Sequence, residues 1–100
     1  MFFGEWHIWK TNIIVIDNPI EKLESINGYY YNWKKGKDES LQVGVIEQEV
    51  EEVLPEIVST DDGYKSVDYS KLTPLLIEAV KQQQQTIKSL IERIEVLEGK

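Results

Sequence analysis

The chain has 100 residues with a formal net charge of −7 at pH 7 and no cysteine. This length suits one domain with a modest core, for which oligomerisation is a natural source of further stability. The acidic balance argues against nucleic-acid and anionic-membrane partners, and the lack of cysteine excludes disulfides and thiol nucleophiles. With His7 as the single histidine, we expect no metal site and no cofactor. We also see neither a signal peptide nor a membrane span.

Residues 1–16 are rich in aromatic and β-branched side chains, a composition typical of strands. The unbroken apolar run from Ile13 to Ile16 predicts a strand buried on both faces, in the core or at an interface. We favour the core. Exposed aromatic side chains among residues 1–9, such as Trp6 and Trp9, would instead indicate a ligand- or receptor-binding tip.

A short helix is predicted next. Asn18 can cap it, Pro19 suits its first position, and Glu21 follows three residues after the cap. Asn27 and Gly28 are expected to end the helix, because glycine tolerates the left-handed conformation found after helix C-termini.

The middle of the chain predicts two strands, a helix and a hairpin. The strands are residues 29–33 and 41–46, separated by a polar loop. An acidic helix over 47–54 is stopped by Pro55, and residues 57–60 and 64–67 flank a turn of the Asp-Asp-Gly type. The acidic side chains lack the spacing of a calcium loop, so a solvated helix face is the better interpretation. Strand packing likewise explains the aromatic cluster from Tyr29 to Trp33 better than stacking on sugars or bases.

The last third of the chain carries a heptad repeat. One series at a positions is Val80, Ile87 and Ile94, and a second at d positions is Leu76, Gln83, Leu90 and Leu97. These seven side chains predict a coiled-coil seam on a helix that starts near Thr73. The alternative is a long amphipathic helix packed on its own domain. We disfavour it because the seam outreaches a core built from the rest of the chain.

The number of helices in the coiled coil stays open at this point. Isoleucine at a with leucine at d favours a coiled coil of two helices. Ile91 at an e position widens the apolar face, which suits three or more. Gln83 places a polar layer at d, and such layers fix register and stoichiometry at some cost in stability.

Four stretches, residues 18–23, 27–33, 44–56 and 63–76, recur in order and spacing in one family. From about residue 11 onward, the chain resembles the C-terminal intramolecular chaperone domain (peptidase S74 type) of phage endosialidases, tail spikes and tail fibres. The resemblance implies a homotrimer that brings three upstream fibre or spike chains into register and then cuts itself off. No cofactor is implied, and the expected location is the virion tail fibre or the host cytoplasm during virus assembly.

The family's self-cleavage resembles the work of a Ser-Lys dyad in a Ser-Asp-x-Arg-Leu-Lys motif, with cleavage just before the serine. Here Thr11 takes the serine position and Ile16 the lysine position, while Ile14 replaces the arginine. Ile16 cannot act as a base, and Lys10 would point away from Thr11 in a strand. We therefore expect self-cleavage to be lost or very weak.

Together these observations predict an α+β fold: a small, mostly antiparallel sheet with short helices, followed by a long coiled-coil helix that forms a parallel homotrimer. Residues 1–72 would be a globular chaperone domain, with 1–10 a remnant of an upstream fibre, and residues 73–100 the trimerising helix. We expect an assembly chaperone rather than an enzyme. The alternatives are an active self-processing protease that uses Thr11 and a receptor- or ligand-binding fibre tip.

Overall fold

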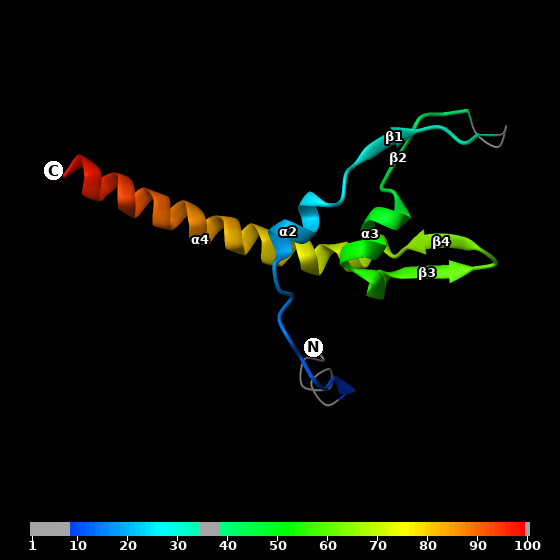
Figure 1. Cartoon of the computed structure of the whole chain (residues 1–100), viewed down its shortest axis with the longest axis horizontal. Coiled ribbons are helices and arrows are strands. Elements are labelled where there is room, and N and C mark those ends of the chain that lie inside the picture. Colours follow the sequence, from blue (N-terminus) through cyan, green and yellow to red (C-terminus); the bar gives the residue numbers. More distant parts are fainter. Residues whose placement is uncertain (1–8, 35–38, 100) are drawn as a thin grey trace, which may run out of the picture.

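The computed structural model describes residues 9–34 and 39–99, and it shows a small α+β body followed by one long helix (Figure 1). The elements in chain order are α2 (Pro19–Glu24), β1 (Tyr29–Tyr31), β2 (Gln42–Gly44), α3 (Glu47–Val53), β3 (Val58–Asp61), β4 (Tyr64–Val67) and α4 (Leu72–Glu98). Single turns of 3₁₀ helix at Pro55–Ile57 and Tyr69–Lys71 precede β3 and α4. The α+β class, the short helices and the long C-terminal helix are therefore confirmed.

The strands form two separate antiparallel ribbons rather than one small sheet, which corrects the prediction. Strand β1 pairs with β2, and β3 pairs with β4. Each ribbon closes on the strand that follows it in the chain, and α3 lies between the two pairs in sequence and contacts β3 and β4. The strands are only three or four residues long, so each ribbon offers little edge for a further strand to pair with.

The turn between β3 and β4 is set by two residues with positive φ. Asp62 has φ of 49° and Gly63 has φ of 79°, the combination required by the two-residue turns that match strand twist. The register then pairs Val58 with Val67 at the open end of the ribbon. The hairpin prediction is confirmed, because this signal is entirely local.

Helix α2 starts at Pro19 as expected but ends at Glu24, short of the predicted stop. Asn18 is the N-cap residue with φ of 47°, and its side chain makes no capping hydrogen bond. Gly28 does not have a positive φ, so the expected left-handed glycine after the helix is wrong. The helix ends without one, because Ser25 closes it in a helical conformation through its backbone N–H.

The core of the described residues is small. Val50 on α3 and Leu75 on α4 are fully buried, and Ile57 and Ala79 are nearly so. Leu75 and Ala79 lie one turn apart on α4, which packs against α2, and Pro19 of α2 is buried as well. The body is thus held to the first two turns of α4.

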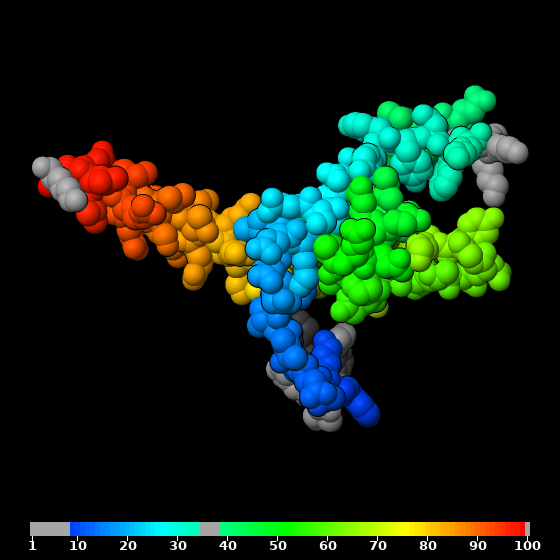
Figure 2. All heavy atoms as spheres, in the orientation of Figure 1, coloured from blue at the N-terminus to red at the C-terminus, as the bar shows by residue number. Residues whose placement is uncertain are grey.

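Beyond those turns α4 has no buried residue, although Asn18 and Pro19 still lie beside it as far as Lys88. Every described residue from 80 to 99 is exposed on all faces of the helix, and the helix projects away from the body as a bare rod (Figure 2). The radius of gyration is 19.2 Å, whereas a compact chain of this length has about 13 Å. A single chain therefore does not bury the apolar surface that its sequence carries.

The segment from Ile13 to Ile16 is not a strand, and the prediction of a buried core strand is wrong. It is extended without a pairing partner among the described residues, and Ile14 is 84% exposed. A β-branched run predicts extended backbone, but a strand also needs a neighbour, and α4 is the element beside it. The remaining strand-like residues 1–8, including Trp6, lie outside the described part of the chain.

Candidate assembly site

The seven heptad residues form one exposed line along α4, which we call the α4 seam. Its six apolar members are between 47% and 66% exposed in the single chain, and Gln83 is exposed with them. The members, from the body outward, are Leu76, Val80, Gln83, Ile87, Leu90, Ile94 and Leu97. Apolar surface in a continuous line of this length indicates an interaction site rather than scattered surface residues.

The body covers a different face of α4 from the one that carries the seam. Leu75 and Ala79 are buried, whereas the next residue along in each case, Leu76 or Val80, is exposed. Neighbouring residues point about 100° apart around a helix. The seam is therefore not packed on its own domain, as the alternative interpretation required.

Further apolar side chains widen the seam on one side. Ile77 and Ile91, both at e positions, are about half exposed. Glu78 and Lys81 lie outside the seam and form an ion pair at 3.6 Å, with Glu78 half-buried beside the N-terminal segment. None of the seven a and d positions of the seam carries a charged residue, so association would bury no unpaired charge there.

The degenerate catalytic positions lie in the irregular N-terminal segment. Thr11 is exposed, outside any helix or strand, and its hydroxyl makes no hydrogen bond to a described residue. Ile16 is half-buried against α4. A shallow hollow on this face is lined by Ile14, Val15, Ile16, Pro74, Ile77 and Glu78. Ile16 thus packs on the helix and offers no proton acceptor to Thr11.

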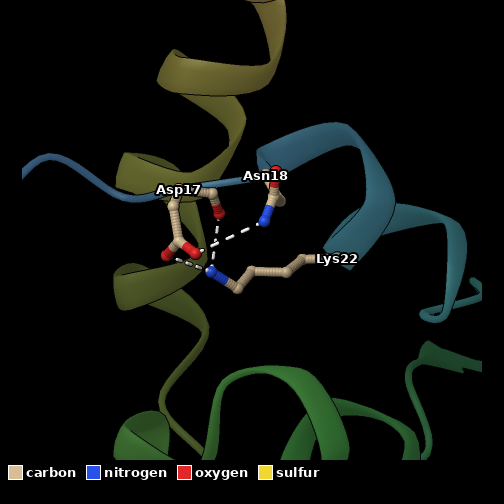
Figure 3. Close-up of polar contacts among 3 residues, drawn as sticks. All are labelled: Asp17, Asn18 and Lys22. Carbon is tan, nitrogen blue, oxygen red and sulfur yellow. Dashed lines mark hydrogen bonds and ion pairs between the residues drawn. The ribbon is translucent and has the colours of Figure 1, made fainter.

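An ion pair that sequence reasoning missed fixes the turn from this segment into α2 (Figure 3). The Lys22 Nζ donates to Asp17 Oδ1 at 2.8 Å and to the Asp17 carbonyl oxygen at 2.6 Å. Asn18 Nδ2 reaches Asp17 Oδ2 at 3.4 Å. The hydrogen bond from Lys22 is the largest cause that lowers the pKa of Asp17. Lys22 is therefore engaged at this turn and is not free to serve Thr11 as a base.

A second missed cluster ties the connection between α2 and β1 to α3. The Glu49 carboxylate accepts hydrogen bonds from the Tyr29 hydroxyl at 2.7 Å, the Asn27 backbone N–H at 3.2 Å and Asn27 Nδ2 at 3.4 Å. We call these three residues the Glu49 cluster. The hydrogen bond with Tyr29 lowers the pKa of Glu49 and raises the pKa of Tyr29. No sequence signal would have found it, because the partners are about twenty residues apart.

The part of the chain that the structure describes lacks the features of two other classes of site. Residues 9–34 and 39–99 contain no group of three or more His, Cys, Asp or Glu side chains arranged to hold a metal ion. Within the same ranges, no helix combines the length and the apolar character needed to cross a membrane.

The sequence pattern that defines the family described as chaperone of endosialidase (peptidase S74) matches residues 9–59. Long tail fiber protein Gp37 of Salmonella phage S16 is 34% identical over 98 residues, which cover 88% of this chain and 13% of that protein. The protein of the same name from Escherichia phage AR1 is 43% identical over 61 residues, 54% of this chain and 6% of that protein. A third, from Enterobacteria phage T2, is 29% identical over 93 residues, 85% of this chain and 7% of that protein.

The chain thus spans between 6% and 13% of the length of these relatives. The family match takes in α2, β1, β2, α3 and the start of β3, which is most of the body. It confirms the resemblance that was drawn from the four sequence stretches. The chain belongs to the chaperone of endosialidase family.

Proposed function

We propose that this chain is the assembly module of a phage tail fibre, and that it associates through the α4 seam into a parallel homotrimer. The exposed seam is the observation that carries the proposal, because its six apolar side chains are all left uncovered by the described part of the single chain. The tail-fibre part rests on the relatives' names. The module would act on the fibre polypeptide upstream of it, during assembly in the host or on the virion.

Bringing three upstream chains into register addresses a physical difficulty of fibre folding. Long-range β pairing is slow, since the entropy of closing the loops is lost before the contacts form. A trimer held at one end removes part of that loss, because the three chains start from a common point. In this proposal, residues 1–72 contact the upstream fibre, and residues 73–100 associate with the same helix of the two other protomers.

The gain from burial and the cost of association are of similar size, so we expect the trimer to depend on protein concentration. Burying the exposed half of one seam side chain contributes about 1 kcal/mol, so the six apolar members contribute about 6 kcal/mol per protomer. Association costs roughly 4–15 kcal/mol in lost translational and rotational freedom. Ile77 and Ile91 at the e positions add apolar area that a third helix covers better than a second.

Sedimentation equilibrium over a range of protein concentrations tests this proposal. We expect three times the chain mass at the upper end of the range. A dimer would contradict the trimeric mechanism, and a monomer throughout would overturn the assembly function.

A matched pair of variants links the mass to the seam. Ile94 and Val96 are both β-branched and similarly exposed, at 53% and 61%, but only Ile94 belongs to the seam. Ile94→Asp should abolish the trimer, because it buries three unpaired carboxylates in one layer. Val96→Asp should leave it intact. Equal effects of the two changes would show that association does not use the seam.

We also propose that self-cleavage is lost, so that the module stays attached to its fibre. The support is the pair of degenerate positions: the Thr11 hydroxyl makes no hydrogen bond to a described residue, and Ile16, at the lysine position, is packed on α4. Expression with a native upstream segment, followed by intact mass measurement, should give an uncut chain that behaves identically with Thr11→Ala. A cut before Thr11 that this change abolishes would establish the alternative, an active self-processing protease.

One observation favours a second candidate, a receptor- or ligand-binding fibre tip. Trp9 is 83% exposed, and exposed aromatics in this part of the chain are the feature expected of such a tip. Trp9 fluorescence in the assembled trimer, measured in a variant with the other tryptophans replaced by phenylalanine, separates the two. Strong quenching by iodide would support the binding-tip hypothesis. Protection from quenching would show that Trp9 lies in the assembly interface.

A further inference from the structure

Asn27 and Gly28 connect α2 to β1, and the assembly function does not account for the glycine. The φ of Gly28 is not positive, and a Cβ added there would meet no atom within 4 Å. Neither backbone conformation nor packing in the described structure therefore requires a glycine at this position. What glycine alone supplies is a backbone nitrogen with no side chain beside it to shield it.

That nitrogen is accessible. Both residues are exposed and lie outside the flanking helix and strand. The Gly28 N–H donates no hydrogen bond to any described residue. The Asn27 side-chain carbon Cγ is placed by covalent geometry so that bonding to the Gly28 nitrogen closes a five-membered ring. An unpaired, unshielded backbone nitrogen next to an asparagine is the arrangement that ring closure needs.

We propose that Asn27 is a site of spontaneous deamidation whose products loosen the attachment of β1 to α3. The Gly28 nitrogen bonds to Asn27 Cγ, the Cγ–Nδ2 bond breaks, and the proton from the Gly28 nitrogen leaves with Nδ2 as ammonia. Water then opens the cyclic imide at one of its two carbonyl carbons. The product is aspartate or isoaspartate at position 27, and no oxidant or metal takes part.

The structural consequence follows from the Glu49 cluster. Asn27 Nδ2 now lies 3.4 Å from Glu49 Oε1 as a donor, and either product replaces it with a second carboxylate. Two like charges at this separation repel each other. Isoaspartate also lengthens the main chain, which displaces the Asn27 N–H from its 3.2 Å bond to the same oxygen. Because Tyr29 opens β1 and shares this carboxylate, the ribbon of β1 and β2 loses part of its anchor.

Peptide mapping of the aged full-length chain tests the chemistry and contains its own comparison. Trypsin releases residues 23–34, which hold both Asn27 and Asn32. Both side-chain amides donate hydrogen bonds of similar length, Asn27 Nδ2 to Glu49 at 3.4 Å and Asn32 Nδ2 to backbone carbonyl oxygens at 3.3 Å. The two sites therefore differ in the residue that follows, which is Gly28 in one case and the bulky Trp33 in the other. On incubation at mildly alkaline pH, the mass gain of one deamidation should accumulate at Asn27, with isoaspartate among the products, and not at Asn32.

The matched control is Gly28→Ala, which the open space around Gly28 accommodates without a fold change. This change should slow the reaction at Asn27 many-fold, because the added methyl shields the nitrogen. Equal deamidation rates at Asn27 and Asn32, or an unchanged rate at Asn27 in Gly28→Ala, would overturn the assignment of Asn27 as the modification site.

A second measurement tests the consequence without ageing the protein. Asn27→Ala removes the side-chain donor, and Asn27→Asp removes it and adds the charge. We expect a lower Tm for Asn27→Asp than for Asn27→Ala, with the difference shrinking in high salt and vanishing in the Glu49→Gln background. Equal Tm values for the two variants at low salt would overturn the coupling to α3, even if deamidation itself occurs.

Discussion

Gly44 lies beneath two tyrosine rings, and this close approach is why the position is a glycine. A Cβ there would stand 2.9 Å from Tyr69 Oη and 3.2 Å from Tyr31 Cε1. Tyr69 Oη in turn accepts a hydrogen bond from the Val45 N–H at 3.2 Å. The contact joins the end of β2 to the 3₁₀ turn Tyr69–Lys71 that leads into α4, and it has room only because position 44 carries no side chain.

Gly44→Ala should therefore destabilise the body by about 1–3 kcal/mol, the usual cost of overpacking. Urea denaturation followed by far-ultraviolet circular dichroism measures the change. Gly28→Ala is the control for glycine replacement as such and should be close to neutral, because it meets nothing within 4 Å. In the Tyr69→Phe background the cost of Gly44→Ala should fall, since the nearest atom is gone. An equal cost in both backgrounds would contradict the clash.

The Glu49 cluster predicts a pH dependence at both ends of the scale. The pKa of Glu49 is lowered from its ordinary value of 4.5 by the Tyr29 hydrogen bond, so its stabilising effect is present above pH 4.5 and is lost as pH falls through the lowered value. The pKa of Tyr29 is raised from 10.0 by the same bond, so its effect is present below pH 10.0 and is lost as pH rises through the raised value. Tm measured against pH should show both losses. Both should be weaker in Tyr29→Phe, and an unchanged profile in that variant would contradict the assignment.

At the scale of elements, α4 presents two faces whose roles differ. The face with Leu75 and Ala79 holds the body, and the α4 seam beside it is left open. The heptad pattern indicated the seam because period and residue type are local properties of a helix. Which face the body occupies was not readable, since Leu75 and Leu76 are the same residue type in adjacent positions.

Gln83→Leu tests the polar layer of the seam. We expect the assembly to resist dilution better, because an apolar layer contributes about 1 kcal/mol or more per side chain. We also expect it to lose its single stoichiometry, because the polar layer that opposes other registers is gone. Sedimentation velocity should show a mixture of oligomers. A tighter assembly that remains purely trimeric would mean that Gln83 does not specify the number of helices.

At the scale of the whole molecule, the burial pattern predicts that the body folds without the outer part of the seam. The buried apolar residues end at Ala79 along the chain, and everything described beyond it is exposed. Ending the chain after Gln82 should therefore give a monomer whose body keeps its fold. Its backbone amides in β3 and β4 should show the same protection from hydrogen exchange as in the full chain. Loss of that protection would show that the body depends on association for its stability.

What the sequence determined by itself were the features whose causes are local. These were the hairpin turn at Asp62 and Gly63, the start of α2 at Pro19, the short helix α3 and the heptad repeat of α4. Its family resemblance was specific enough for the comparison to confirm. Two other features depended on what lies beside a segment in space. The run from Ile13 to Ile16 has strand composition but no strand to pair with, and the strands close into two ribbons rather than one sheet.

Only the tertiary structure showed what Gly44 and Glu49 do. Gly44 makes room for Tyr69, which comes from a distant segment of the chain. Glu49 accepts hydrogen bonds from residues about twenty positions earlier in the sequence. Gly28 serves neither conformation nor packing. The physical reason is the same throughout: a local pattern fixes backbone conformation and the side on which apolar residues gather. Which surfaces are then covered and which are left open depends on contacts between segments that no local pattern encodes.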